Sequence, residues 1–222
     1  FDGVHRGHQT ILDQGKEKAD HLGVPSVVMV FEPQPREFFQ GDEAPPRLTG
    51  FRQKFETLLA SGVDVVLCMI FDETFLSYSG MGFIDDVLID GLKVRHLVVG
   101  DDFRFGCDRA GDFRLLQQVG EKAGYSVENT RTVTVEGDRV SSTRIRHALQ
   151  DNQLELAGQL LGRAYAITGR VVYGRQLGRT IGAPTANILL GRMAPLQGVY
   201  VVAVSLPDGR QLDGVANIGL RP

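Results

Sequence analysis

The stretch Ser26-Val-Val-Met-Val-Phe31 is an unbroken apolar run with three valines. Such a run is typical of a strand that is buried on both faces of a parallel sheet. Similar runs follow at Val63–Phe71 and Val94–Gly100. The spacing of apolar residues around these runs predicts helices over Thr10–Leu22, Phe51–Ala60, Phe83–Leu92 and Asp112–Ala123. Strands that alternate with helices in this way predict βαβ units and an α/β fold with an open parallel sheet.

The pattern changes after Gly162. Further short strands (Tyr125–Val140) and two helices (Ser142–Leu149 and Leu154–Leu161) are predicted before this point. Beyond it, short valine-rich segments separated by Gly and Pro occupy Ala166–Tyr173, Ala186–Leu190, Val199–Leu206 and Gln211–Ile218. Such segments predict a small β-barrel. We therefore expect one domain over residues 1–162 and part of a second over residues 163–222.

The composition is that of a globular protein, and its charge and hydropathy argue against nucleic-acid and membrane partners. The formal net charge of −3 gives no basic excess, so no nucleic-acid partner is expected. No stretch approaches the ~18 apolar residues of a membrane span, and no signal peptide is recognisable. The two cysteines show neither metal-ligand spacing nor a disulfide framework, which favours a cytoplasmic location. We also expect the chain to be a fragment, because it opens directly on a motif and stops within a predicted strand and its turn.

A pair of histidines in His5-Arg-Gly-His8 directly precedes the first predicted helix. A helix N-terminus favours an anion, and Gly7 lets backbone N–H groups approach it closely. Two imidazole donors at this point suit the transfer of a nucleotidyl group, which requires stabilisation of charge on the attacked phosphate and hardly needs a general base. A surface turn with incidental histidines is the alternative. A zinc site is disfavoured because no third ligand lies at the required spacing.

A second candidate anion site is Ser141-Ser-Thr-Arg-Ile-Arg146, which opens a later predicted helix. One hydroxyl is enough to cap a helix, and a purely structural cap is the alternative interpretation. Here three hydroxyls (Ser141, Ser142 and Thr143) are followed by Arg144 and Arg146. This combination predicts a phosphate cradle in which either arginine neutralises the leaving pyrophosphate.

Two further segments carry candidate ligand contacts. In Gly100–Gly106 (GDDFRFG), Phe103 and Phe105 flank Arg104 and predict an aromatic, cationic ledge for a flavin or adenine ring, unless the rings only anchor the loop. In the valine-rich part, a glycine recurs every four residues through Gly174–Gly182 before the sequence PTAN. Glycine at this density allows close approach to phosphates, or makes turns at barrel corners.

Taken together, these motifs resemble those of the bacterial bifunctional riboflavin kinase/FMN adenylyltransferase (FAD synthetase) family. FDGVHRGH and SSTRIR resemble its HxGH and ISSTxxR motifs, and residues 31–35 (FEPQP) and GDDFRFG resemble two intermediate loops. PTAN (184–187), PLQGVY (195–200) and GVANIG (214–219) resemble its kinase half. The resemblance covers essentially the whole chain. The family's first strand and Gly-rich lead-in would precede Phe1, and its kinase carboxylate base would follow Pro222.

The resemblance implies a Rossmann-like HxGH nucleotidyltransferase sheet followed by part of a small riboflavin-kinase β-barrel. It implies transfer of AMP from ATP to FMN, giving FAD and pyrophosphate, and phosphorylation of riboflavin by the complete protein with Mg²⁺. The implied catalytic residues are His5, His8 and Arg144. The implied ATP-binding residues are Gly3, His5, Gly7, His8, Ser141, Ser142, Thr143, Arg144 and Arg146. Flavin contacts would come from Phe31, Pro33, Asp102, Phe103 and Phe105. The kinase Mg-ATP site would comprise Gly178, Gly182, Thr185 and Asn187, with Thr185 and Asn187 at the metal.

Two other functions stay open on the sequence. One is another HxGH nucleotidyltransferase, whose acceptor is phosphopantetheine, nicotinamide mononucleotide or glycerol phosphate. The PTAN segment argues against it, because such enzymes need no riboflavin kinase module. The other is a flavin or nucleotide sensor without catalysis. Intact HRGH and SSTRIR argue against a sensor, and pyrophosphate release would distinguish it from an enzyme.

Overall fold

The computed structural model describes residues 1–100, 102–174, 185–190 and 193–219. Its helical segments are α1 (Arg6–Leu22), α2 (Pro35–Gln40), η1 (Gly41–Glu43), α3 (Phe51–Ala60), α4 (Glu73–Leu76), α5 (Gly80–Gly82), the π-helical η2 (Phe83–Gly91), α6 (Phe113–Ala123), α7 (Ser142–Gln150) and α8 (Leu154–Leu161). Its strands are β1 (Val27–Glu32), β2 (Val65–Ile70), β3 (His96–Val99), β4 (Ser126–Asn129), β5 (Thr134–Val135), β6 (Asp138–Arg139), β7 (Val171–Val172), β8 (Asn187–Ile188), β9 (Gly198–Ser205) and β10 (Gln211–Ile218).

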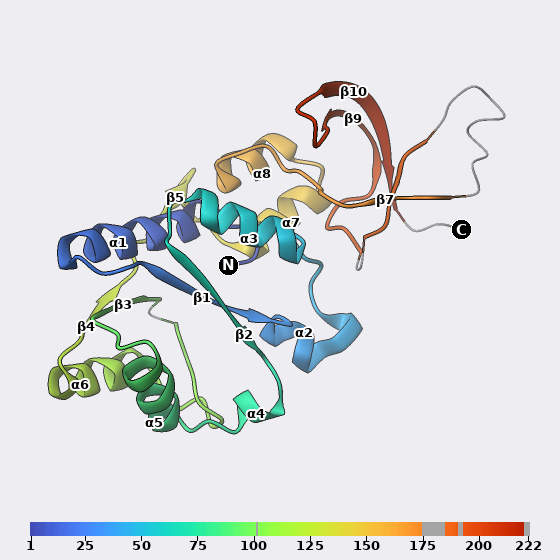
Figure 1. Ribbon diagram of the computed structural model, residues 1–222. Helices are drawn as coiled ribbons and strands as arrows, with labels where there is room; N and C mark the ends of the chain where they lie inside the picture. Colours follow the sequence, from blue (N-terminus) through green and yellow to red (C-terminus); the bar gives the residue numbers. More distant parts are fainter. Residues whose placement is uncertain (101, 175–184, 191–192, 220–222) are drawn as a thin grey trace.

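Two parallel strand pairs form the centre of the α/β part, as the apolar runs predict (Figure 1). Strand β1 pairs with β2 from Val27↔Val65 to Glu32↔Ile70, and β3 pairs with β4 from His96↔Ser126 to Val99↔Asn129. Each pair joins strands that are connected through helices, which is the βαβ arrangement of an α/β fold. The predicted fold class is therefore confirmed.

A groove of about 540 Å³ lies between β1 and β3 and is lined mainly by apolar side chains. Consecutive residues of both strands line it, Val27 to Met29 on one side and His96 to Gly100 on the other. Side chains of a strand alternate between faces, so a lining of consecutive residues means that backbone edges border the groove.

The helices differ from the sequence-based expectation at several places, and the short segments η1, α4 and α5 are not among those expected. Helix α1 begins at Arg6 rather than Thr10, because the His5 side chain caps it. Helix α2 is absent from the expectation, although it has a proline at its start and a capping box between Gln34 and Glu37. The segment η2 is π-helical, with the Leu92 N–H bonded to the Val87 carbonyl. Apolar spacing over two turns does not separate an α-helix from this wider form.

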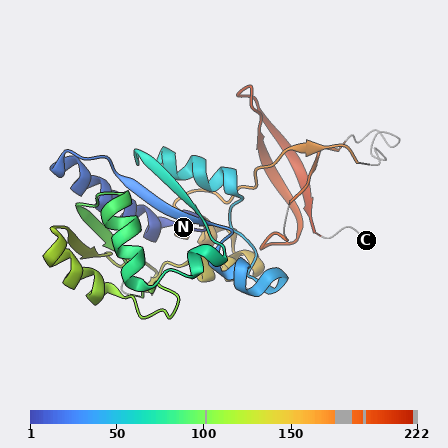
Figure 2. The ribbon, with the colours of Figure 1, turned by 60° about the horizontal axis from the view of Figure 1, so that its bottom comes forward.

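The valine-rich part forms antiparallel pairs, with β9 against β10 (red in Figure 2) and β7 against β8. Strands β7 and β8 are two residues each, shorter than predicted. Buried Leu196 and half-buried Tyr200 and Ile218 pack against the core of α7 and α8. Of the predicted kinase residues, Gly178 and Gly182 lie outside the described residues. In the part of the chain that the structure describes, no helix is long and apolar enough to cross a membrane.

Two glycines inside helices give a paired test of this packing. An alanine Cβ at Gly120 of α6 would lie 2.6 Å from the backbone carbonyl oxygen of Tyr125, whereas a Cβ at Gly15 of α1 meets nothing within 4 Å. Alanine is the better helix former by about 1 kcal/mol. We therefore expect Gly15→Ala to raise the free energy of unfolding by about 0.5–1 kcal/mol and Gly120→Ala to lower it. Urea unfolding measures both, and equal signs would contradict the packing described here.

Candidate active site

The N-termini of α1 and α7 meet at one place in the fold. The Ser142 hydroxyl donates a hydrogen bond of 2.9 Å to the Asp2 carbonyl, across 140 residues of sequence. A Cβ at Gly7 would lie 3.5 Å from the Val140 carbonyl oxygen, so the first turn of α1 lies against the lead-in to α7. Each helix N-terminus carries unpaired N–H groups and a partial positive charge. The fold thus brings the two predicted anion sites together.

The rings of His5 and His8 stack on each other, with their centroids 3.6 Å apart and an angle of 15° between the planes. His5 is 5% exposed, and its Nδ1 accepts the backbone N–H of His8 at 3.3 Å. Burial lowers the pKa of His5 to about 4, and burial lowers the pKa of His8 well below 6.5. Both imidazoles are therefore neutral near pH 7, and each has a single N–H to donate.

The buried Nδ1 of His8 has no hydrogen-bond partner among the described residues. A buried polar atom without a partner is costly in a folded protein and often marks a ligand position. The ring of Phe1, with its centroid 4.9 Å away, covers another side of His8. This atom and the adjacent helix N-termini make the His5–His8 pair a candidate position for a polar or anionic ligand.

A strained turn leads into the histidines. Gly3 has φ +82°, and a Cβ there would lie 2.8 Å from Cδ1 of Leu48, so only glycine fits. Val4 has φ +40° and is completely buried. A left-handed backbone at a β-branched residue costs on the order of 1–3 kcal/mol and persists only where the surroundings hold it. Gly3, predicted to bind ATP, thus contributes its conformation to the site.

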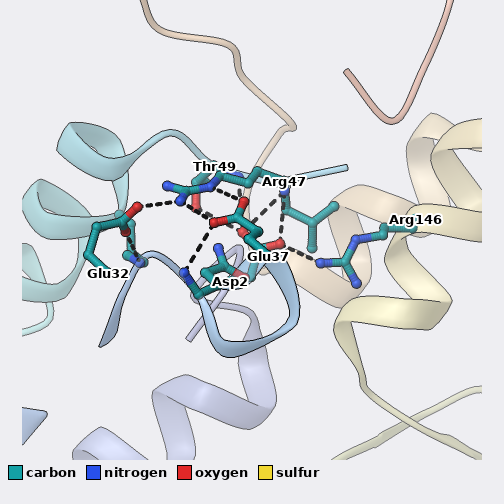
Figure 3. A network of polar contacts seen from close by, with 9 residues as sticks. Asp2, Glu32, Glu37, Arg47, Thr49 and Arg146 are labelled. Carbon is teal, nitrogen blue, oxygen red and sulfur yellow. Dashed lines mark hydrogen bonds and ion pairs between the residues drawn. The ribbon is translucent and has the colours of Figure 1, made fainter. Parts of the chain in front are cut away.

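Buried Asp2 fastens this turn to two other segments (Figure 3). Its carboxylate accepts the backbone N–H groups of Leu48 (3.0 Å) and Thr49 (3.2 Å) and forms a 2.5 Å ion pair with the Arg146 guanidinium. Arg146 also donates to the Pro46 carbonyl at 2.7 Å. The predicted phosphate ligand Arg146 is therefore engaged by Asp2 in this structure.

Next to Asp2 lies a second group of buried and half-buried charges, also drawn in Figure 3. Arg47 pairs with Glu32 at the end of β1 and with buried Glu37 of α2, and its hydrogen bond to Glu37 raises the pKa of the guanidinium. Lys54, 3% exposed, forms a 3.3 Å ion pair with Glu32. These bonds fix the loop after β1, which carries Pro33. Lys54 shares the buried face of α3 with Leu58. A lysine at an apolar position of the helical pattern is the sequence feature from which this ion-pair network could have been predicted.

The hydroxyl residues at the start of α7 have different surroundings. Ser141 is the N-cap, and its hydroxyl accepts the Arg144 N–H at 3.2 Å, while Thr143 is exposed. Arg144 donates to the carbonyls of Val135 (2.8 Å) and Asp138 (3.0 Å) in the β5–β6 hairpin. To reach a phosphate, the Arg144 side chain has to exchange these acceptors.

Aromatic rings connect the two predicted flavin loops. Ring centroids link Phe31 to Phe75 (5.0 Å), Phe75 to Phe83 (6.0 Å), Phe83 to Phe105 (5.4 Å) and Phe105 to Phe103 (5.5 Å). Phe105 is buried, and a Cβ at Gly111 would lie 2.6 Å from its ring. It therefore anchors the loop, which leaves the half-buried Phe103 as the accessible ring of the expected ledge. Asp102 and Pro33 are exposed, and Phe31 and Phe103 both line the apolar groove.

The described part of the kinase site is small. Exposed Thr185 and half-buried Asn187 line a cavity of about 180 Å³ with β7 and Gly174. Hydroxyl and amide oxygens are hard ligands of the kind that Mg²⁺ accepts beside phosphate oxygens, so these two residues fit that ion. In the described residues, no group of three His, Cys, Asp or Glu side chains is placed to hold a metal.

Comparison with known proteins supports the resemblance seen in the sequence. The family model described as FAD synthetase matches residues 1–144, and the one described as riboflavin kinase matches residues 161–222. Proteins named bifunctional riboflavin kinase/FMN adenylyltransferase are 54% identical in Pseudomonas fluorescens and 51% identical in Escherichia coli K12. Both are matched over 100% of this chain and 71% of their own length.

A solved structure agrees with the fold. The structure described as a macrolide-efflux protein from Streptococcus pneumoniae has a TM-score of 0.83 at 31% identity, over 99% of this chain and 71% of that one. Two family models thus match in succession along the chain, and relatives are similar over its whole length. The chain belongs to the bifunctional riboflavin kinase/FMN adenylyltransferase family.

Proposed function

We propose that residues 1–162 transfer AMP from ATP to FMN, giving FAD and pyrophosphate. The observation that carries this proposal is the meeting of the α1 and α7 N-termini around the His5–His8 pair, inside a chain of this family. An oxygen of the FMN phosphate attacks the α-phosphorus of ATP, and the bond from that phosphorus to the bridging oxygen of the β-phosphate breaks. The acceptor is already an ionised phosphate, so no base has to remove a proton from it.

The two neutral histidines donate hydrogen bonds to the charge that builds on the α-phosphate. Their burial means that little water competes for these donors, and a preorganised donor in such a place is worth more than one in solvent. The unpaired N–H groups at the start of α1 add to this stabilisation, and Gly7 leaves room for the phosphate beside them. Residues Ser142 and Thr143 would position phosphate oxygens at the N-terminus of α7.

Arg144 is the cation that we assign to the leaving pyrophosphate. Its present partners are two neutral carbonyls and the carboxylate of Glu136, which is 63% exposed and 3.6 Å away. A phosphate carries a full negative charge and can accept two parallel N–H bonds from one guanidinium, which a neutral carbonyl cannot, so exchange of the carbonyl partners is favourable. Arg146 would act mainly through Asp2, since that ion pair is already buried.

The flavin would lie toward Phe31 and Phe103, at the ends of β1 and β3 where ligands of parallel sheets bind.

We place the domain boundary at residue 162, since α8 ends at Leu161 and the riboflavin kinase match begins at residue 161. At the length of its relatives, the protein would also phosphorylate riboflavin, with Thr185 and Asn187 holding Mg²⁺ and ATP. Mg²⁺ would supply charge neutralisation at the phosphates in that half. We expect a cytoplasmic protein without nucleic-acid or membrane partners.

The first experiment is a product assay on the 222-residue chain and on the chain extended to the length of its relatives. Each is incubated with Mg-ATP and FMN, and FAD and pyrophosphate are followed by chromatography. Riboflavin and phosphopantetheine serve as parallel acceptors. We expect the extended chain to form FAD from FMN and FMN from riboflavin. If AMP is transferred to phosphopantetheine and not to FMN, the proposed acceptor is wrong and the transfer chemistry stands. If no acceptor leads to pyrophosphate release, a sensor without catalysis is favoured over an enzyme.

Replacement of His8 by alanine tests the donor role. His21, exposed in the last turn of α1, provides the matched control. We expect His8→Ala to lower the turnover number about 10²-fold or more, because one preorganised donor is lost, while His21→Ala leaves it unchanged. Circular dichroism checks that both variants are folded. A loss below a few-fold at His8 would remove this residue from the mechanism.

The low histidine pKa values also predict how stability changes with pH. Between about pH 4 and 6.5 the unfolded chain binds a proton at His5 that the folded chain excludes. The free energy of unfolding should therefore fall as the pH falls from 6.5, by at most about 1.4 kcal/mol per pH unit for each such imidazole. His5→Asn keeps a capping oxygen and should flatten this dependence. Urea unfolding at pH 5.5, 6.0 and 6.5 compares the two proteins, and equal slopes would contradict the assignment.

A further inference from the structure

Arg163, the residue after the proposed domain boundary, reaches back to the turn that precedes the histidines. Its guanidinium donates to the carbonyl oxygens of Gly3 (2.7 Å), Val4 (3.1 Å) and Leu161 (3.4 Å). The side chain is half-buried, and burial lowers its pKa. No motif in the sequence marked this residue as part of the nucleotide site.

The boundary segment lies directly against the first turn of α1. Gly162 has φ +76°, and a Cβ there would lie 3.2 Å from Oε1 of Gln9 and 3.3 Å from Cγ of Arg6. The Gln9 side-chain amide in turn donates to the carbonyls of Val4 (3.0 Å) and Leu161 (3.1 Å). Arg163 and Gln9 thus share acceptors on the turn and on the end of α8.

These bonds hold a conformation that the chain would otherwise avoid. Both Gly3 and Val4 are left-handed, and valine rarely adopts this conformation. Their carbonyl groups are buried and need donors. The next residue is His5, whose ring caps α1 and stacks on His8. The direction of the turn therefore sets where both rings lie.

We infer that Arg163 is a positioning residue for nucleotidyl transfer, because it fixes the Gly3–Val4 turn and, through that turn, the His5–His8 pair. The inference rests on the proposed function of the histidines. The Arg163 guanidinium is engaged by backbone carbonyls, so its effect on the reaction would pass through the turn. Arg163, the first residue of the kinase half, thereby holds the histidine donors of the transferase half in position.

Arg163→Met keeps most of the side-chain stem and removes the donors, whereas Arg163→Lys keeps the charge but not the planar fork. Arg170, exposed just before β7, gives the control Arg170→Met. We expect Arg163→Met to lower kcat for FAD formation about tenfold or more, with KM for ATP and FMN within threefold. Arg163→Lys should lie between it and the parent protein, and Arg170→Met should match the parent. Thermal unfolding defines a temperature at which every variant is folded.

A second readout does not depend on activity. In NMR spectra of the histidine rings, Arg163→Met should shift or broaden the His5 and His8 signals, and Arg170→Met should leave them in place. Unchanged ring signals, or a kcat within twofold of the parent, would overturn the positioning role. If the parent protein forms no FAD at all, the proposed function fails, and the ring signals still decide whether Arg163 holds the turn.

Discussion

The buried carboxylate of Asp2 is the interaction on which the site depends. It binds the backbone at Leu48 and Thr49 and pairs with Arg146 of α7, so it ties the first turn of the chain to two distant segments. A buried charge is costly unless it is paired and hydrogen-bonded, and Asp2 has both kinds of partner. Removal of one partner would leave the other charge uncompensated. This network fixes the direction from which the chain enters α1.

Burial gives the histidine pair its chemical character. Two stacked imidazoles in solvent would titrate near pH 6.5, but here desolvation keeps both neutral. Neutral rings lie close together without charge repulsion, and each retains one N–H donor. The positive field then comes from the helix N-termini and from Arg144, whose charge does not depend on pH in this range. Donor geometry and positive charge are therefore supplied by different groups.

The boundary between the two halves is also a structural contact. Arg163 and Gly162 lie against the first turn of α1, while Leu196 and Tyr200 pack on the core of α7 and α8. Helix α7 therefore carries residues of the predicted anion site on its first turn and contacts the kinase half through its apolar face.

The α/β class, most strand and helix positions and the two anion motifs could be predicted from the order of the amino acids, because apolar periodicity and helix-start chemistry are local properties. The helix over Leu154–Leu161 and the strand over Gln211–Ile218 agree with the structure to the residue. The pairing of Arg146 with Asp2, the burial of Phe105 and the contact of Arg163 with the turn before His5 became visible in the folded chain. Each of these depends on which residues meet across 100 or more positions, or on packing against another element, and a linear pattern does not contain that information.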